Sequence, residues 1–141
     1  MTWTRSSRRS GGIVTKRVFV IAGSRDYPAN GQVERELDKI LQRDDVVITG
    51  GARGVDTAAT ARAREIGCRL VVMTADWAQY GKRAGMIRNR AMLERLVKAR
   101  FLKWETMVVC FWANNSPGTR NTMMVADELM LDLVVFVPER C

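Results

Sequence analysis

Residues 48–56, Ile-Thr-Gly-Gly-Ala-Arg-Gly-Val-Asp, join a short apolar run to an alanine-rich helical pattern through a glycine-rich turn. Glycine permits the positive φ angles that turn the backbone and expose its N–H groups, and the following helix directs the positive end of its dipole to the same place. Arg53 adds a positive charge. Alone, such a turn fits a plain strand-to-helix connection as well as it fits a phosphate site.

Two more turns follow apolar runs in the same way. The sequence Gly-Ser-Arg-Asp-Tyr at 23–27 follows the run 18–22, and Ser-Pro-Gly-Thr at 116–119 follows the run 107–112. Together the three turns predict a shared site for an anionic ligand. Its candidate residues in these turns are Gly23, Ser24, Arg25, Gly50, Gly51, Arg53, Gly54, Asp56, Ser116, Gly118 and Thr119.

Some of these candidates also suit purely structural roles. Ser116 and Thr119 stand where a hydroxyl commonly caps a helix, and Asp56 can cap the helix that starts near Thr57. For Asp56 we expect capping ahead of catalysis.

Apolar runs rich in Val and Ile alternate with helical patterns along the chain. Runs without polar alternation are typical of parallel strands that are covered on both faces. We therefore predict an α/β fold: a Rossmann-like, doubly wound, mainly parallel five-stranded sheet with helices on both faces. Its strands are expected at 18–22, 46–49, 69–73, 107–112 and 133–137, and its helices at 31–43, 57–66, 84–101 and 120–131. In such sheets ligands bind at the carboxyl ends of the strands, where strand order reverses. If 18–22 and 107–112 are neighbours there, their turns face one crevice.

Composition favours a single domain with an anionic partner. The chain has 141 residues, 47% of them hydrophobic, and 23 Lys and Arg against 15 Asp and Glu give a net charge of +8. We expect one domain over 14–141. Residues 1–13, rich in Ser, Gly and Arg, are predicted to form a flexible basic arm that either contacts nucleic acid or is an over-extended start.

Neither a membrane segment nor a metal site is expected. No stretch approaches the ~20 apolar residues of a membrane span and no secretion signal is evident, so we expect a cytoplasmic protein. Cys68, Cys110 and Cys141 are odd in number and widely spaced, which favours free thiols. With no histidine the chain lacks the usual zinc ligand and the usual general base.

Aromatic and basic side chains gather in the irregular segment 74–84. Trp77 and Tyr80 either stack on a base or ribose or pack the segment against the core, whereas Lys82 is a candidate phosphate ligand. Arg88 and Asn89 begin the next helix, and Arg88 is either a ligand contact or a solvent-facing charge. Met92, four residues after Arg88, shares its face of the helix.

The patterns Gly-Ser-Arg-Asp-Tyr, Thr-Gly-Gly-Ala-Arg-Gly-Val-Asp, Trp-x-x-Tyr-Gly-Lys-x-Ala-Gly-x-x-Arg-Asn-x-x-Met and Ser-x-Gly-Thr, in this order over residues 16–137, resemble the SLOG superfamily. The resemblance is to its small YspA-like, YpsA-related branch of bacterial and phage proteins. It implies a Rossmann-like fold that binds a nucleotide or an ADP-ribose-like ligand, with no required cofactor, as a homodimer or higher homo-oligomer.

The wider superfamily also contains phosphoribohydrolases and single-stranded DNA-binding proteins, so fold alone does not choose the function. The phosphoribohydrolases resemble this chain at Arg88 and at Gly118-Thr119, but Thr122 stands where they have a glutamate. A threonine cannot supply a carboxylate. Asp26 and Asp56 are the nearest candidate replacements, with Arg88 beside them as a candidate catalytic cation. We therefore predict ligand binding, with N-glycosidase or phosphoribohydrolase activity on a nucleoside monophosphate, or binding of single-stranded nucleic acid, as alternatives.

Overall fold

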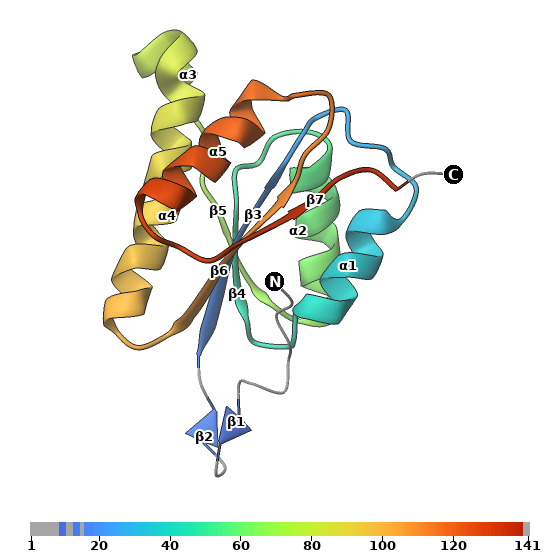
Figure 1. The fold of residues 1–141 in the computed structure, drawn as a ribbon, viewed down its shortest axis with the longest axis vertical. Helices are drawn as coiled ribbons and strands as arrows, with labels where there is room; N and C mark the ends of the chain where they lie inside the picture. The colour runs from blue at the N-terminus through green and yellow to red at the C-terminus, as the bar shows by residue number, and fades with distance from the viewer. Residues whose placement is uncertain (1–8, 11–12, 15, 140–141) are drawn as a thin grey trace.

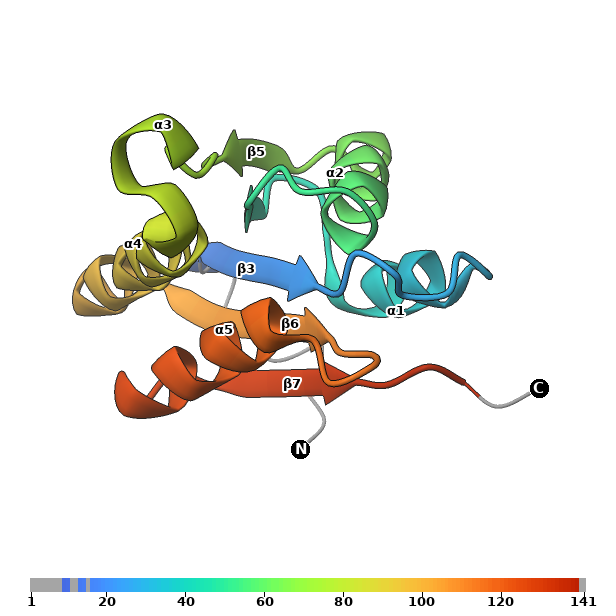
Figure 2. The same ribbon diagram turned by 90° about the horizontal axis from the view of Figure 1, so that it is seen from above.

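A computed structural model of the protein describes residues 9–10, 13–14 and 16–139, and its centre is a five-stranded sheet in the order β5-β4-β3-β6-β7. All neighbouring pairs in this sheet are parallel. Figure 2 shows the strands side by side from β5 to β7. The predicted sheet is confirmed. Its strands are β3 (Arg17–Gly23), β4 (Val46–Thr49), β5 (Arg69–Val72), β6 (Glu105–Phe111) and β7 (Leu133–Phe136).

Two helices cover each face of the sheet, as Figure 1 shows, and the predicted Rossmann-like α/β fold is thereby confirmed. Successive side chains of β3 divide between the two faces because the side-chain period of a strand is two. Phe19 and Ile21 pack with α1 (Gln32–Ile40) and α2 (Val55–Ile66). Val18, Val20 and Ala22 pack with α4 (Ala84–Phe101) and α5 (Pro117–Glu128) on the other face.

Strand order reverses between β3 and β6, which are hydrogen-bonded neighbours. Their pairing runs from Arg17 opposite Glu105 to Gly23 opposite Phe111. The chain leaves β3 toward β4 and β5 on one side and later places β7 beyond β6 on the other. The two turns that follow β3 and β6 therefore meet at one edge, as the sequence predicts.

Helix ends differ from the predicted limits for local reasons. The helix α1 ends at Ile40 because Leu41 is already extended, with ψ 148. The helix α5 begins at Pro117 rather than at residue 120, because proline fits the first turn, where no backbone N–H is needed. The segment 74–84, predicted to be irregular, contains the short helix α3 (Trp77–Tyr80) and the 3-10 helix η2 (Gly81–Arg83). The carboxylate of Asp76 caps α3 by accepting from the backbone N–H of Gln79 at 3.0 Å.

Most of the predicted arm, residues 1–13, lies outside the described residues. The strand β1 (Arg9–Ser10) lies within it and pairs in antiparallel fashion with β2 (Ile13–Val14), which extends one residue beyond it. Cys68 and Cys110 carry free thiols, and Cys141 also lies outside the described part of the chain. No helix among residues 16–139 combines the length and the apolarity that crossing a bilayer requires.

Candidate functional site

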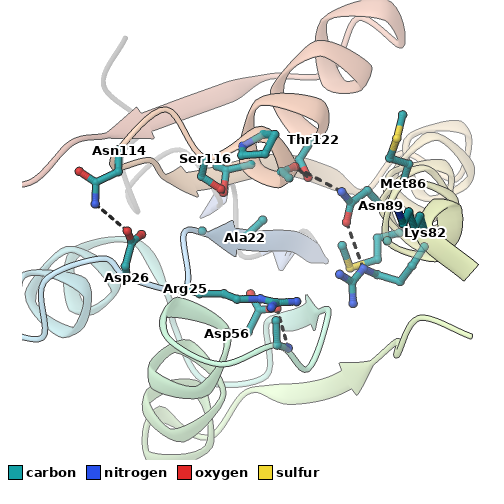
Figure 3. A pocket seen from close by; sticks show the side chains of 18 of the residues that line it. Ala22, Arg25, Asp26, Asp56, Lys82, Met86, Asn89, Asn114, Ser116 and Thr122 are labelled. Atoms are coloured by element: carbon teal, nitrogen blue, oxygen red, sulfur yellow. Dashed lines mark hydrogen bonds between the residues drawn. The ribbon is translucent and has the colours of Figure 1, made fainter. Parts of the chain in front are cut away.

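A cavity of about 760 Å³ opens at the carboxyl ends of β3 and β6, where the strand order reverses. Figure 3 shows side chains reaching into it from the turns after these strands, from the start of α2, from α5 and from the α3–α4 region. Its volume lies within the range of about 300–1,000 Å³ typical of small-molecule sites. The lining residues are Ala22, Gly23, Arg25, Asp26, Ala52, Asp56, Trp77, Lys82, Gly85, Met86, Arg88, Asn89, Met92, Asn114, Ser116, Pro117, Gly118, Thr119 and Thr122.

The structure brings most of the predicted site residues together at this cavity. Those that line it are Gly23, Arg25, Asp26, Asp56, Trp77, Lys82, Arg88, Asn89, Ser116, Gly118 and Thr119. Those that do not are Ser24, Gly50, Gly51, Arg53, Gly54 and Tyr80. The sequence predicts no ligand role for the lining residues Ala22, Gly85, Met86, Met92, Asn114 and Thr122.

The glycine turn 50–54 folds around a carboxylate of the protein itself. Asp56 is 5% exposed, and its Oδ2 accepts a hydrogen bond from the backbone N–H of Ala52 at 3.0 Å. The carboxylate thus binds the N–H of Ala52 in the turn. The helix α2 begins at Val55 after Gly54 and has no side-chain cap, so the expected capping by Asp56 is wrong. Burial raises the pKa of the Asp56 carboxyl, while the backbone N–H of Ala52 and the guanidinium of Arg88 oppose that rise.

Two glycines of this turn are closely packed against neighbouring segments and lie outside the cavity lining. Gly50 is buried, and a Cβ there would lie 2.6 Å from Arg88 Nη1. Gly54 has φ 81, and a Cβ there would lie 2.5 Å from the carbonyl oxygen of Arg25. The turn therefore needs glycine so that the chain segments carrying two arginines can approach it.

Arg88 is anchored above the ends of β4 and β5 by its own hydrogen bonds. Nη1 donates to the carbonyl oxygen of Gly50 and, at 3.4 Å, to that of Met73. Nε donates to Asn89 Oδ1 at 3.0 Å. No atom of the described residues accepts a hydrogen bond from Nη2. Burial lowers the pKa of this guanidinium and the charge of Asp56 opposes that change, yet arginine stays protonated in proteins. A fixed cation therefore borders the cavity.

The first turn of α5 lines the same space with Pro117, Gly118 and Thr119, of which the last two carry a backbone N–H. The first N–H groups of any α-helix lack intrahelical acceptors. Ser116, the residue before the helix, makes no side-chain capping bond, and its hydroxyl lies 3.4 Å from Thr119 Oγ1. Asn89 Nδ2 donates to the Gly118 carbonyl oxygen at 3.3 Å and thereby ties α4 to this turn. The predicted capping role of Ser116 is thus not seen, and these N–H groups remain open to an anion.

The carboxylates at the cavity are those of Asp26 and Asp56 among the described residues. Thr122 is 1% exposed and its hydroxyl donates to the Gly118 carbonyl oxygen at 3.3 Å, so this wall carries no acid where the phosphoribohydrolases have glutamate. Glu128 lies farther along α5, outside the cavity, and pairs with Arg90 at 2.7 Å. No group of three His, Cys, Asp or Glu side chains within the described ranges could hold a metal ion.

Trp77 is the aromatic side chain that reaches the cavity. It is 52% exposed and packs over Gly85, where a Cβ would lie 3.4 Å from its ring. Tyr80 lies on the same short helix but outside the cavity, and Lys82 follows it on the cavity wall. Of the two predicted stacking residues, the structure therefore brings only Trp77 to the site.

Comparison with known proteins accords with this architecture. The sequence profile of the YspA, cpYpsA-related SLOG family matches residues 17–80. The Gene 61 protein of Mycobacterium phage D29 is 30% identical over 128 residues, which cover 85% of this chain and 96% of that protein. The chain belongs to the YspA, cpYpsA-related SLOG family. The SLOG profile spans the turns after β3 and β4 together with α3, whereas the α4 and α5 walls of the cavity lie beyond it.

Proposed function

We propose that this SLOG protein binds a nucleotide or a nucleotide-derived ligand by its phosphate groups. The observation that carries the proposal is the convergence of Arg25, Lys82 and Arg88, from three separate segments, on the cavity that the α5 N-terminus also borders. Cations and unpaired backbone N–H groups in one concave site are complementary to a phosphate. Family membership supports the same ligand class.

Trp77 provides the contact for a base. Its half-exposed ring stands on the wall that also carries Lys82, so a base can stack there while its phosphate meets the cations. Stacking of a base on an aromatic ring contributes about 1–3 kcal/mol and tolerates different bases. The proposal therefore assigns a nucleotide-like ligand without assigning its base.

Thermal shift and calorimetric titration test this proposal with ribonucleoside mono-, di- and triphosphates, ADP-ribose and inorganic phosphate. Lys82→Ala and Arg25→Ala are expected to weaken nucleotide binding about fivefold or more, because each removes a charged contact worth about 1 kcal/mol or more. Arg53→Ala is the matched control, since Arg53 is an exposed cation of the neighbouring turn outside the cavity. Absence of binding by every nucleotide, or equal affinities for all three variants and the wild type, would contradict the proposal.

Cleavage of an N-glycosidic bond is the second candidate, and the position of Asp56 favours it. This carboxyl borders the cavity beside Arg88, and burial raises its pKa toward the range useful for proton transfer. Release of free base from nucleoside monophosphates, lost in Asp56→Asn, would support the reaction. Ligand binding without base release would leave binding as the function.

A further inference from the structure

We infer that Asp26 and Asn114 form a subsite for the ribose hydroxyls of the bound nucleotide. This inference rests on the proposed function and specifies which part of the ligand the two residues bind. The two residues come from the turns after β3 and β6 and both line the cavity. Asn114 Nδ2 donates to Asp26 Oδ2 at 2.6 Å. Figure 3 shows this contact among the side chains that line the cavity.

The backbone beneath the pair holds its two members opposite each other. Ser24 Oγ accepts from the Ala113 N–H at 2.9 Å and donates to the Ala113 carbonyl oxygen at 3.1 Å. The N–H of Ser24 also donates to the carbonyl oxygen of Phe111 at 3.0 Å. Asn114 follows with φ 52, a left-handed conformation that asparagine tolerates better than most residues. The position of the pair is therefore set by main-chain contacts and not by its own side chains alone.

The chemistry of the pair suits hydroxyl donors. An ionised carboxylate can only accept hydrogen bonds, so Asn114 must turn its NH₂ group toward Asp26. Asn114 Oδ1 and Asp26 Oδ1 then remain as acceptors, and no described residue donates to either of them. Two neighbouring acceptors match the two O–H donors of a ribose 2′,3′-diol. The negative charge of Asp26 disfavours a phosphate at this end.

The groups at the other end of the cavity orient the ligand. In Figure 3, Lys82 and Asn89 lie at the opposite end from Asp26 and Asn114. Trp77, the one aromatic ring among the described lining residues, belongs to the α3 wall near Lys82. Phosphate and base are thereby directed to the cationic and aromatic wall, and the sugar edge is left for the acceptor pair.

Titration of ribonucleoside 5′-mono- and diphosphates against their 2′-deoxy counterparts tests the inference. In the wild type, loss of the 2′-hydroxyl is expected to weaken binding about tenfold or more, because a hydrogen bond to a charged acceptor is lost. Asp26→Ala should bind both sugars about equally, near the wild-type affinity for the deoxy form. Asn114→Gly keeps the left-handed backbone but removes the amide, and should lose part of the preference.

Asp127→Ala is the matched control, because Asp127 is an exposed carboxylate on α5 outside the cavity; this variant should keep the full ribose preference. Nucleotide binding without any ribose preference in the wild type overturns the subsite while the proposed function stands. A preference that Asp26→Ala retains also overturns it. Tighter binding of guanine nucleotides in both sugar forms would assign the pair to the base and would also overturn the subsite. Absence of all nucleotide binding overturns both the subsite and the proposed function.

Discussion

Ser24 binds both backbone hydrogen-bonding groups of Ala113, 89 positions along the chain. This single hydroxyl joins the turn after β3 to the turn after β6 at the point where the strand order reverses. Ser24 is 1% exposed and does not line the cavity, although the sequence suggests a ligand contact. Its effect on a ligand is therefore indirect, through the placement of Asp26 and Asn114.

Replacement of Ser24 by alanine is expected to lower the free energy of unfolding by about 1–3 kcal/mol, the usual cost of a buried polar group left without a partner. The Ala113 N–H would lose its acceptor, whereas the Ala113 carbonyl oxygen would keep the hydrogen bond that it accepts from the N–H of Ser116 at 3.1 Å. Urea unfolding measures the change. Thr57→Ala, which removes an exposed hydroxyl bonded to the Ala52 carbonyl oxygen, is the control and should stay within about 0.5 kcal/mol of the wild type. Equal stabilities of the two variants would refute the role given to Ser24.

Gly54→Ala should be far more harmful than Gly118→Ala. At Gly54 a Cβ meets both a positive φ of 81 and the Arg25 carbonyl oxygen at 2.5 Å, so the turn must shift. At Gly118, in the first turn of α5, a Cβ meets nothing within 4 Å. We expect Gly54→Ala to cost about 1–3 kcal/mol and Gly118→Ala to leave stability unchanged or raise it slightly, as judged by urea unfolding. A stability order opposite to this one would be inconsistent with the packing of Arg25 on the turn.

The fold could be predicted from local patterns because its strands are buried on both faces. Uninterrupted apolar runs such as 46–49 mark strands directly, and alternation with helices dictates parallel connections. The sequence does not predict that β3 and β6 are neighbours. It predicts only that their turns face one crevice if they are, and the structure shows them as hydrogen-bonded neighbours. The exact helix ends are harder to predict, because they depend on the chemistry of single residues. The predicted start of α5, residue 120, is therefore three residues later than the observed start at Pro117.

The site is only partly predictable, because a turn residue can contact several different segments of the folded chain and the sequence does not show which one. Sequence shows that Gly50 and Gly54 allow close approach, but not that Arg88 and the backbone of Arg25 are what approach them. The sequence predicts no ligand role for Asn114, because its hydrogen bond to the Asp26 carboxylate depends on tertiary contact between distant turns. The available signal is an asparagine two residues after the predicted strand 107–112.

Cys68 and Cys110 are expected to resist alkylation in the folded protein. Burial raises the pKa of Cys110 to about 12, and burial together with the charge of Asp45 raises that of Cys68 to about 11. The thiolate is the reactive form, so little of it is present at pH 8. Iodoacetamide labelling of Cys141→Ser, followed by mass spectrometry, isolates these two thiols. Cys68, which is partly exposed, should react before Cys110, and both should react fully in urea. Labelling of folded Cys110 as fast as in urea would show that the sheet opens readily.

Asp56→Asn is expected to stabilise the protein at neutral pH. Burial holds the pKa of folded Asp56 above its value in the unfolded chain, about 3.9, so folding takes up a proton in the window between the two values. The free energy of unfolding of the wild type should therefore fall as the pH rises through this window. Above the window, the destabilisation caused by burying the ionised carboxylate is present in full. The asparagine oxygen can still accept from the Ala52 N–H, which Asp56 now binds at 3.0 Å.

The measurement is the difference in unfolding free energy between Asp56→Asn and the wild type, from urea titrations between about pH 3 and pH 7. The difference should favour the variant at pH 7 and shrink toward zero below about pH 3.9, where the wild-type carboxyl is neutral in both states. Asp127→Asn, an exposed site on α5, controls for the loss of one negative charge. A variant less stable than the wild type at pH 7 would mean that the charge of Asp56, through Arg88 and the turn amides, stabilises the site more than its burial costs.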